Sequence, residues 1–175
     1  MDNYFELFGL PEQYSLDQTA LTNTFRDLQK SVHPDQFVSQ GEQAQRLAVQ
    51  QSAQINDAFQ TLKVPLKRAQ YMLQLAGIDL QAEQHTLRDS AFLMQQMEWR
   101  EHLEALKQAE DLDGLEQFSD TIAAAQKQLN DKIAQALDAG QHHQDAPTWA
   151  NEVRKLSFMN KLMVEIAQAE DALDY

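Results

Sequence analysis

Apolar residues recur at helical spacing along most of this chain, and no stretch alternates apolar and polar residues over the length of a strand. Two amphipathic helices are predicted on either side of Pro34, one from the Ser15 cap to Val32 and one over about residues 43–62. Their apolar faces are formed by Leu21, Phe25, Leu28 and Val32 in the first helix and by Ala48, Ser52, Ile55, Phe59 and Leu62 in the second. Because a polar turn joins two helices of similar length, they are expected to pack as an antiparallel hairpin.

Shorter elements flank this hairpin. Tyr4–Phe8 is predicted as a short helix, and Ser15 with Gln18 has the spacing of a capping box for the helix that follows. After the hairpin, a short helix is expected over Leu66–Leu75 and a chain break at Gly77.

The second half of the chain predicts three longer helices. They cover Thr86–Glu110, Leu115–Ala139 and a stretch from Pro147 to the C-terminus. Thr86 with Asp89 is expected to cap the first helix, and Asp113-Gly114 is expected to separate it from the second. Short connections favour an antiparallel three-helix bundle. The sequence therefore predicts an all-α protein with a hairpin domain at 1–75, a linker at 76–84 and a three-helix bundle at 85–175.

Charge separates the two halves. Residues 1–75 hold 6 Lys/Arg and 8 Asp/Glu, a net charge of −2, whereas residues 76–175 hold 8 and 19, a net charge of −11. The total of −13 disfavours nucleic acid and anionic membranes as partners. No apolar run reaches the ~20 residues that span a bilayer, and no signal peptide is recognisable. These features predict a soluble, cytoplasmic protein.

The helix predicted from Thr86 has two apolar faces. With Phe92 at zero degrees, Trp99, Leu103 and Leu106 fall within about 40° of it and form a core stripe. On the far side, at about 100° to 200°, lie Leu93, Met94 and Met97, with Glu98 and Glu101 beside them. In the last helix, Phe158 is predicted to point roughly opposite to the core face of Trp149, Val153, Leu156 and Met163.

Two interpretations of this second apolar face remain open. It can pack against the linker or the other domain, or it can bind another protein. Flexible Met and Leu side chains with neighbouring glutamates suit a partner that carries Lys or Arg.

His33-Pro34-Asp35 lies at the turn of the hairpin. The tripeptide can be a simple turn, because proline ends helices and aspartate favours turns. It can also be a contact surface, because a carboxylate held in place by proline can pair with an arginine of another protein.

The first 75 residues resemble a J-domain, the module that stimulates ATP hydrolysis by DnaK-type chaperones. The matching segments are Tyr4–Leu10, His33-Pro34-Asp35 and Ile55–Leu62. The resemblance implies chaperone contacts by His33, Pro34, Asp35 and the basic residues Arg26 and Lys30. Val32 and Gln36 depart from the family, which usually has Tyr and Lys there.

The whole chain is similar to the HscB type of J-domain co-chaperone of iron–sulfur cluster assembly. The similarity rests on Pro65–Leu73, Arg88–Glu98 and Arg154–Phe158. It implies that the chain delivers the iron–sulfur cluster scaffold protein to a specialised DnaK-type chaperone and stimulates its ATPase. It also implies scaffold contacts by Leu93, Met94, Met97, Glu98, Glu101 and Phe158. At a further contact position, often acidic in the family, this chain has Ala105.

Little in the sequence indicates an enzyme or a cofactor. There is no cysteine, catalytic triad or phosphate-binding loop. Adjacent His142 and His143 lack a fixed third ligand, and Glu98 with His102 is interpreted as an i,i+4 pair rather than a di-iron motif. We therefore expect no metal, no cofactor and no catalytic activity. A general J-protein that presents unfolded clients and a helical metal enzyme are the alternatives.

Overall fold

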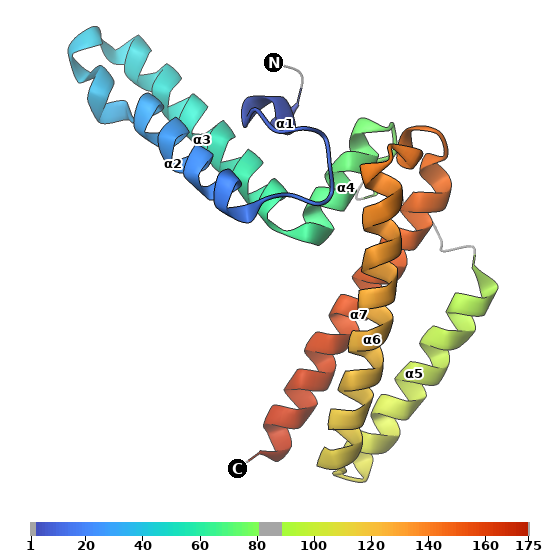
Figure 1. Ribbon diagram of the computed structural model, residues 1–175. Coiled ribbons are helices and arrows are strands. Elements are labelled where there is room, and N and C mark those ends of the chain that lie inside the picture. Colours follow the sequence, from blue (N-terminus) through green and yellow to red (C-terminus); the bar gives the residue numbers. More distant parts are fainter. Residues whose placement is uncertain (1–2, 81–88, 175) are drawn as a thin grey trace. The chain divides into compact units, whose positions relative to one another are not determined.

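The computed structural model describes residues 3–80 and 89–174. Within these residues every regular element is an α-helix or a 3₁₀ helix, and none is a strand, which confirms the all-α prediction. The chain divides into two compact units, Met1–Met72 and Leu73–Tyr175 (Figure 1). The division falls inside one helix, between Met72 and Leu73.

The first unit is built around a helical hairpin. Its elements are α1 (Tyr4–Leu7), α2 (Gln18–Val32), the 3₁₀ helix η1 (Pro34–Gln40), α3 (Glu42–Lys63) and the part of α4 (Pro65–Leu75) up to Met72. Helices α2 and α3 lie side by side and antiparallel (Figure 1). The segment after Pro34, expected as a polar loop, is a 3₁₀ helix because proline fixes φ near the helical value at its first position.

Packing along the hairpin weakens toward its tip. Leu21 is fully buried, whereas Phe25, the next residue of the predicted stripe, is half-buried and stacks on Phe59 with ring centroids 4.0 Å apart. Nearer the tip, the amide of Gln29 donates to the Ser52 carbonyl at 3.2 Å and accepts from the Ser52 hydroxyl at 2.7 Å. Two helices without a third layer leave their outer turns partly in water, so the stripe is only partly core.

Helix α2 begins with a different cap from the predicted one. Asp17 is the N-cap, and its carboxylate accepts from the backbone N–H groups of Thr19 at 3.0 Å and Ala20 at 3.1 Å. The capping box of Ser15 with Gln18 is therefore wrong. An aspartate directly before the helix satisfies two of the free amide groups and adds a negative charge at the positive end of the helix dipole.

The second unit is an antiparallel three-helix bundle, as predicted. Its elements are α5 (Ser90–Gln108), α6 (Leu112–Asp138), the 3₁₀ turn η2 (Gln141–His143) and α7 (Ala146–Leu173). Helices α6 and α7 form the most extensive contact, and α5 packs against both (Figure 1). The fully buried core includes Leu115, Ile122, Ile133, Leu137, Leu162 and Ile166. His142, only 1% exposed, is buried in the turn between α6 and α7.

The chain reverses between α5 and α6 at a different position from the predicted break at Asp113-Gly114, which was wrong. Both residues lie inside α6, and the chain reverses at Glu110, which has a φ of 50°. Asp111 caps α6 by accepting from the Gly114 N–H at 2.9 Å. A Cβ on Gly114 would come within 2.5 Å of both Asp111 Oδ2 and Leu106 Cδ2. The glycine therefore lies at a closely packed position inside a helix and does not mark a turn.

Two further expectations involve residues 81–88, which lie outside the described part of the chain. Thr86 and residues 81–84 of the predicted linker fall there. Helix α5 begins at Ser90 and has Asp89 as its N-cap, whose carboxylate accepts from Phe92 N at 3.0 Å. None of the helices in the described ranges combines the length and apolarity needed to cross a membrane.

Candidate protein-binding sites

The His33-Pro34-Asp35 corner joins α2 to η1. His33 has a φ of −59° and a ψ of 128°, the extended geometry that a following proline favours. Its Nδ1 accepts from the Asp35 backbone N–H at 3.2 Å. Because Nδ1 is the acceptor, the neutral ring carries its proton on Nε2, which can donate to a partner.

The two polar side chains of this corner point into solvent. The His33 side chain is 57% exposed and the Asp35 side chain is 85% exposed. A carboxylate on so short and constrained a segment loses little freedom when it binds. The geometry suits a charged hydrogen bond to an arginine of another protein.

Arg26 and Lys30 extend this surface along α2. One helical turn separates them, and His33 lies three residues beyond Lys30, so Arg26 and Lys30 share the face that leads to the corner. Both are exposed, and neither forms an ion pair with any other residue that the structure describes. The first unit therefore presents two cations and an exposed carboxylate together.

Helix α5 carries large apolar side chains on the side opposite its core stripe. Leu93 is 39% exposed, and Met94 and Met97 are each 63% exposed. On the inner side of the same helix, Phe92 and Leu103 are buried. Because the core stripe already anchors the helix in the bundle, packing of the bundle does not account for these three residues. We call Leu93, Met94 and Met97, together with Glu98, Glu101 and Phe158, the α5 patch.

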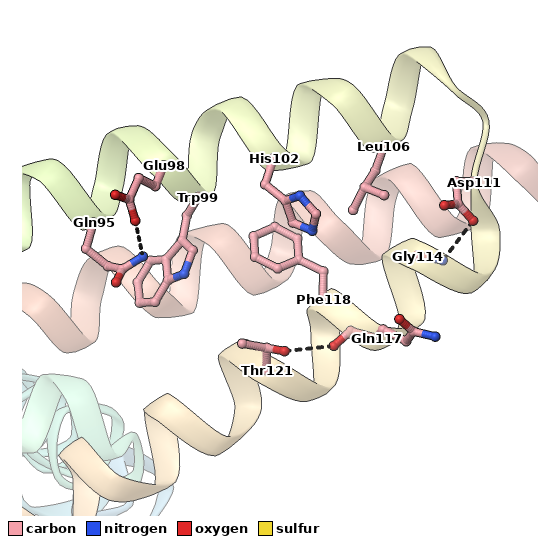
Figure 2. A pocket seen from close by; sticks show the side chains of 10 residues that line it. All are labelled: Gln95, Glu98, Trp99, His102, Leu106, Asp111, Gly114, Gln117, Phe118 and Thr121. Carbon is pink, nitrogen blue, oxygen red and sulfur yellow. Dashed lines mark hydrogen bonds between the residues drawn. The ribbon is translucent and has the colours of Figure 1, made fainter.

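The glutamates of the α5 patch remain accessible. Glu98 and Glu101 are both exposed, and Glu98 accepts a 3.4 Å hydrogen bond from Gln95 Nε2 (Figure 2). Glu98 does not pair with His102, which corrects the i,i+4 interpretation. The His102 ring instead lies edge-on to Phe118 of α6, with centroids 4.7 Å apart (Figure 2). An edge-on aromatic contact across two helices is favoured by the ring quadrupoles and leaves the Glu98 carboxylate available.

Phe158 is the member of the α5 patch whose position was predicted wrongly. It is half-buried and faces α5, where its ring lies 5.8 Å from Phe92 and 6.3 Å from Trp99 between centroids. The Arg100 guanidinium lies 5.2 Å from the same ring and pairs with Glu165.

Helix α7 contacts two helices, so its buried arc is wider than the single stripe expected from periodicity. Its core is completed by Met159, Leu162 and Ile166, while Trp149 and Met163 are only half-buried.

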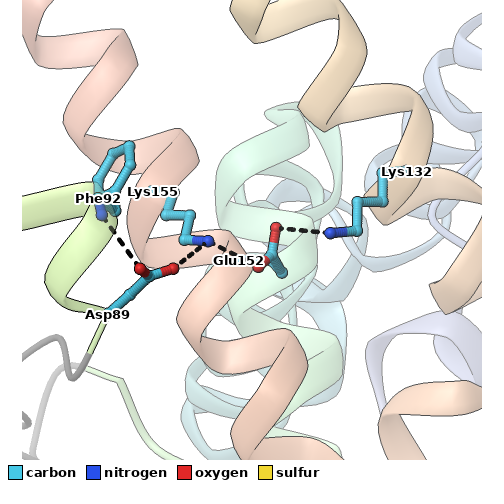
Figure 3. A network of polar contacts seen from close by, with 5 residues as sticks. All are labelled: Asp89, Phe92, Lys132, Glu152 and Lys155. Atoms are coloured by element: carbon cyan, nitrogen blue, oxygen red, sulfur yellow. Dashed lines mark hydrogen bonds and ion pairs between the residues drawn. The ribbon is translucent and has the colours of Figure 1, made fainter. Parts of the chain in front are cut away.

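A polar network fixes the start of α5 on α7 (Figure 3). Lys155 Nζ lies 2.6 Å from Asp89 Oδ2 and 3.0 Å from Glu152 Oε1, and Glu152 is shared with Lys132 at 3.4 Å. Lys155 Nζ also lies 5.6 Å from the centroid of Phe92. The network therefore sets where α5, and with it the α5 patch, begins.

The network also changes the protonation of its members. The hydrogen bond from Lys155 and that from the Phe92 amide lower the pKa of Asp89 below its ordinary value. Burial alone would lower the pKa of Lys155, but its hydrogen bonds to Asp89 and Glu152 outweigh burial and raise it. Both groups are therefore held in their charged forms near neutral pH. The sequence alone does not predict this network, because no spacing rule connects residues 66 positions apart.

Known proteins are similar to this chain in both sequence and fold. The model of the HSCB C-terminal oligomerisation domain matches residues 88–167. The co-chaperone protein HscB homolog of Shewanella oneidensis is 46% identical over 172 residues, which cover 98% of each chain. The homolog of Aeromonas hydrophila is 48% identical over 172 residues with the same coverage. This chain belongs to the HscB family of co-chaperones.

Solved HscB structures agree with this assignment. Chaperone HscB from Vibrio cholerae is 44% identical, with a TM-score of 0.81 over 98% of this chain and 99% of that chain. Human co-chaperone protein HscB is 25% identical, with a TM-score of 0.78 over 96% of this chain and 82% of that chain. The HscB resemblance and the fold that it implied are thus confirmed: a J-domain hairpin followed by a three-helix bundle.

Proposed function

We propose that this HscB-family chain holds two proteins at once. Family membership makes it a co-chaperone of iron–sulfur cluster assembly. In the proposal, the hairpin unit binds a DnaK-type chaperone specialised for that process and accelerates its ATP hydrolysis. The bundle binds the iron–sulfur cluster scaffold protein and brings it to the chaperone in the cytoplasm. The chain itself performs no chemical step, since ATP hydrolysis belongs to the chaperone.

The observation that carries the proposal is the α5 patch. Large apolar side chains exposed together on one face of a packed helix are typical of a protein-binding surface. Leu93, Met94 and Met97 supply adaptable apolar area, and Glu98 and Glu101 supply charge that orients a basic partner. Phe158 packs on the core side of α5, against Phe92 and Trp99, so its proposed contact with the scaffold protein rests on the family resemblance.

For the chaperone, the proposed contacts are His33, Pro34, Asp35, Arg26 and Lys30. The carboxylate of Asp35 would pair with an arginine of the ATPase domain, and the two cations would pair with acidic residues beside it. Joining both surfaces in one chain raises the effective concentration of scaffold protein at the chaperone.

The test is the chaperone's ATPase rate with an Asp35→Asn variant. This change keeps the shape of the side chain and removes its charge, so we expect stimulation to fall by at least tenfold, as for loss of a charged contact worth about 1.5–3 kcal/mol. Asp131→Asn, the same change at an exposed residue of α6, serves as the control. Equal stimulation by wild type and both variants would refute the role of the corner.

A further inference from the structure

A groove runs between α5 and α6 beside the α5 patch. It has a volume of about 480 Å³. Its walls include Trp99 and His102 of α5 and Phe118 of α6 (Figure 2). Glu98 lies at one end, and Asp111 lies at the other, next to the turn between the helices (Figure 2). Glu98 is therefore shared by the groove and the α5 patch, and the two surfaces are continuous around α5.

The acidic and basic side chains that line the groove are unequally represented. The residues that line the groove include two carboxylates, Glu98 and Asp111, and neither a lysine nor an arginine. Its other polar side chains include Gln95, Gln117, Thr121 and His102, which carry no fixed charge of the opposite sign and can both donate and accept hydrogen bonds. The rings of Trp99, His102 and Phe118 supply apolar and aromatic surface between the two carboxylates.

This combination fits a long cationic side chain. A lysine or arginine can lay its apolar stem along aromatic walls, place its charge within about 6 Å of an indole, and direct its N–H groups to a carboxylate. An acidic or purely apolar side chain would gain nothing from Glu98 and would remove its water. The net charge of the bundle half has the same sign as the groove, so it also attracts a basic partner.

We propose that this groove receives a basic side chain of the scaffold protein, and that it thereby selects the partner bound at the α5 patch. The inference rests on the proposed function, because it takes the scaffold protein to be bound at the neighbouring patch. In this account the patch supplies most of the affinity through apolar burial. The groove supplies orientation and specificity through charge.

Gln117 offers a test that leaves the α5 patch intact. It lies on α6, lines the groove and is exposed, and its backbone carbonyl accepts from the Thr121 hydroxyl at 3.1 Å. Gln117→Lys would place a cation where the partner's cation is expected. Gln117→Glu would add a third carboxylate. Gln135→Lys is the matched control, because Gln135 is exposed on the same helix about 27 Å further along its axis.

The measurement is calorimetric titration of each full-length variant with the scaffold protein at low salt. We expect Gln117→Lys to weaken binding about three- to fivefold, and Gln117→Glu to leave it equal or tighter, as for a partly screened charge pair. The effect should shrink at about 0.5 M salt, where screening acts over a few ångströms. Gln135→Lys should bind like the wild type.

Each result has a distinct meaning. If Gln117→Lys binds as tightly as Gln135→Lys, no cation enters the groove, and this inference is wrong while the α5 patch stands. If Gln117→Glu weakens binding as much as Gln117→Lys, the groove receives something other than a cation, and the inference is also wrong. If the wild-type chain does not bind the scaffold protein at all, both the proposed function and this inference fail.

Discussion

Shortening the two methionines of the α5 patch should weaken scaffold binding without changing the fold. Burying a methionine side chain completely contributes about 1.5–3 kcal/mol. Met94 and Met97 are each 63% exposed, so about two-thirds of that contribution, roughly 1–2 kcal/mol each, is available to a partner. After subtraction of the part that alanine retains and the cost of ordering flexible side chains, the pair should contribute about 2 kcal/mol. Met94→Ala with Met97→Ala should therefore weaken binding about thirtyfold.

The assay is calorimetric titration with the scaffold protein, together with thermal unfolding of each variant. Alanine favours helices at least as well as methionine, and the lost atoms are mostly in water, so stability should change by less than about 0.5 kcal/mol. Val164→Ala, at another exposed apolar residue (56%) on α7, is the control and should bind normally. Full affinity in the methionine double variant would refute the assignment of the α5 patch. Phe158→Ala is a weaker test, because its contacts with Phe92 and Trp99 mix binding with stability.

The remaining predictions concern the stability of the bundle, measured by thermal unfolding. Because the pKa of Asp89 is lower in the folded protein than its ordinary 3.8, its contribution is present above about pH 4 and is lost as the pH falls through the folded value. Asp89→Asn should lower Tm at pH 7, and the difference from wild type should shrink toward pH 3; a constant difference would contradict this role of the charge. Gly114→Ala should destabilise by about 1 kcal/mol, because a clash of about 1–3 kcal/mol with Asp111 and Leu106 exceeds the gain in helix propensity. An increase in Tm for Gly114→Ala would show that these side chains move aside freely.

Periodicity predicted those features of this chain that depend on one helix at a time. The exposed side of α5 is an example: placing Leu93, Met94 and Met97 away from Phe92 requires only 3.6 residues per turn. The antiparallel hairpin of α2 and α3 likewise follows from two amphipathic stripes and a short connection. Family resemblance, rather than periodicity, supplied the partners and the roles of residues.

Contacts between two helices could not be predicted from the apolar pattern of either helix alone. Phe158 was placed on the wrong side because a helix with two neighbours buries a broad arc, and the sequence does not say which neighbour covers which part. The edge-on contact of His102 with Phe118 and the ion pair of Lys155 with Asp89 join residues far apart in sequence. The predicted break at Gly114 was wrong for a related reason. In the sequence, a glycine at a closely packed position inside a helix cannot be distinguished from a glycine in a turn.

A mixing experiment shows whether one molecule must hold chaperone and scaffold protein together. Asp35→Asn keeps the α5 patch, and Met94→Ala with Met97→Ala keeps the chaperone-binding corner, so an equimolar mixture contains both surfaces on separate molecules. The measured quantity is the increase in chaperone ATPase rate on adding limiting scaffold protein. We expect the mixture to lose most of the increase given by the wild type, because separate molecules do not raise the local concentration of scaffold protein. An increase equal to that of the wild type would contradict it.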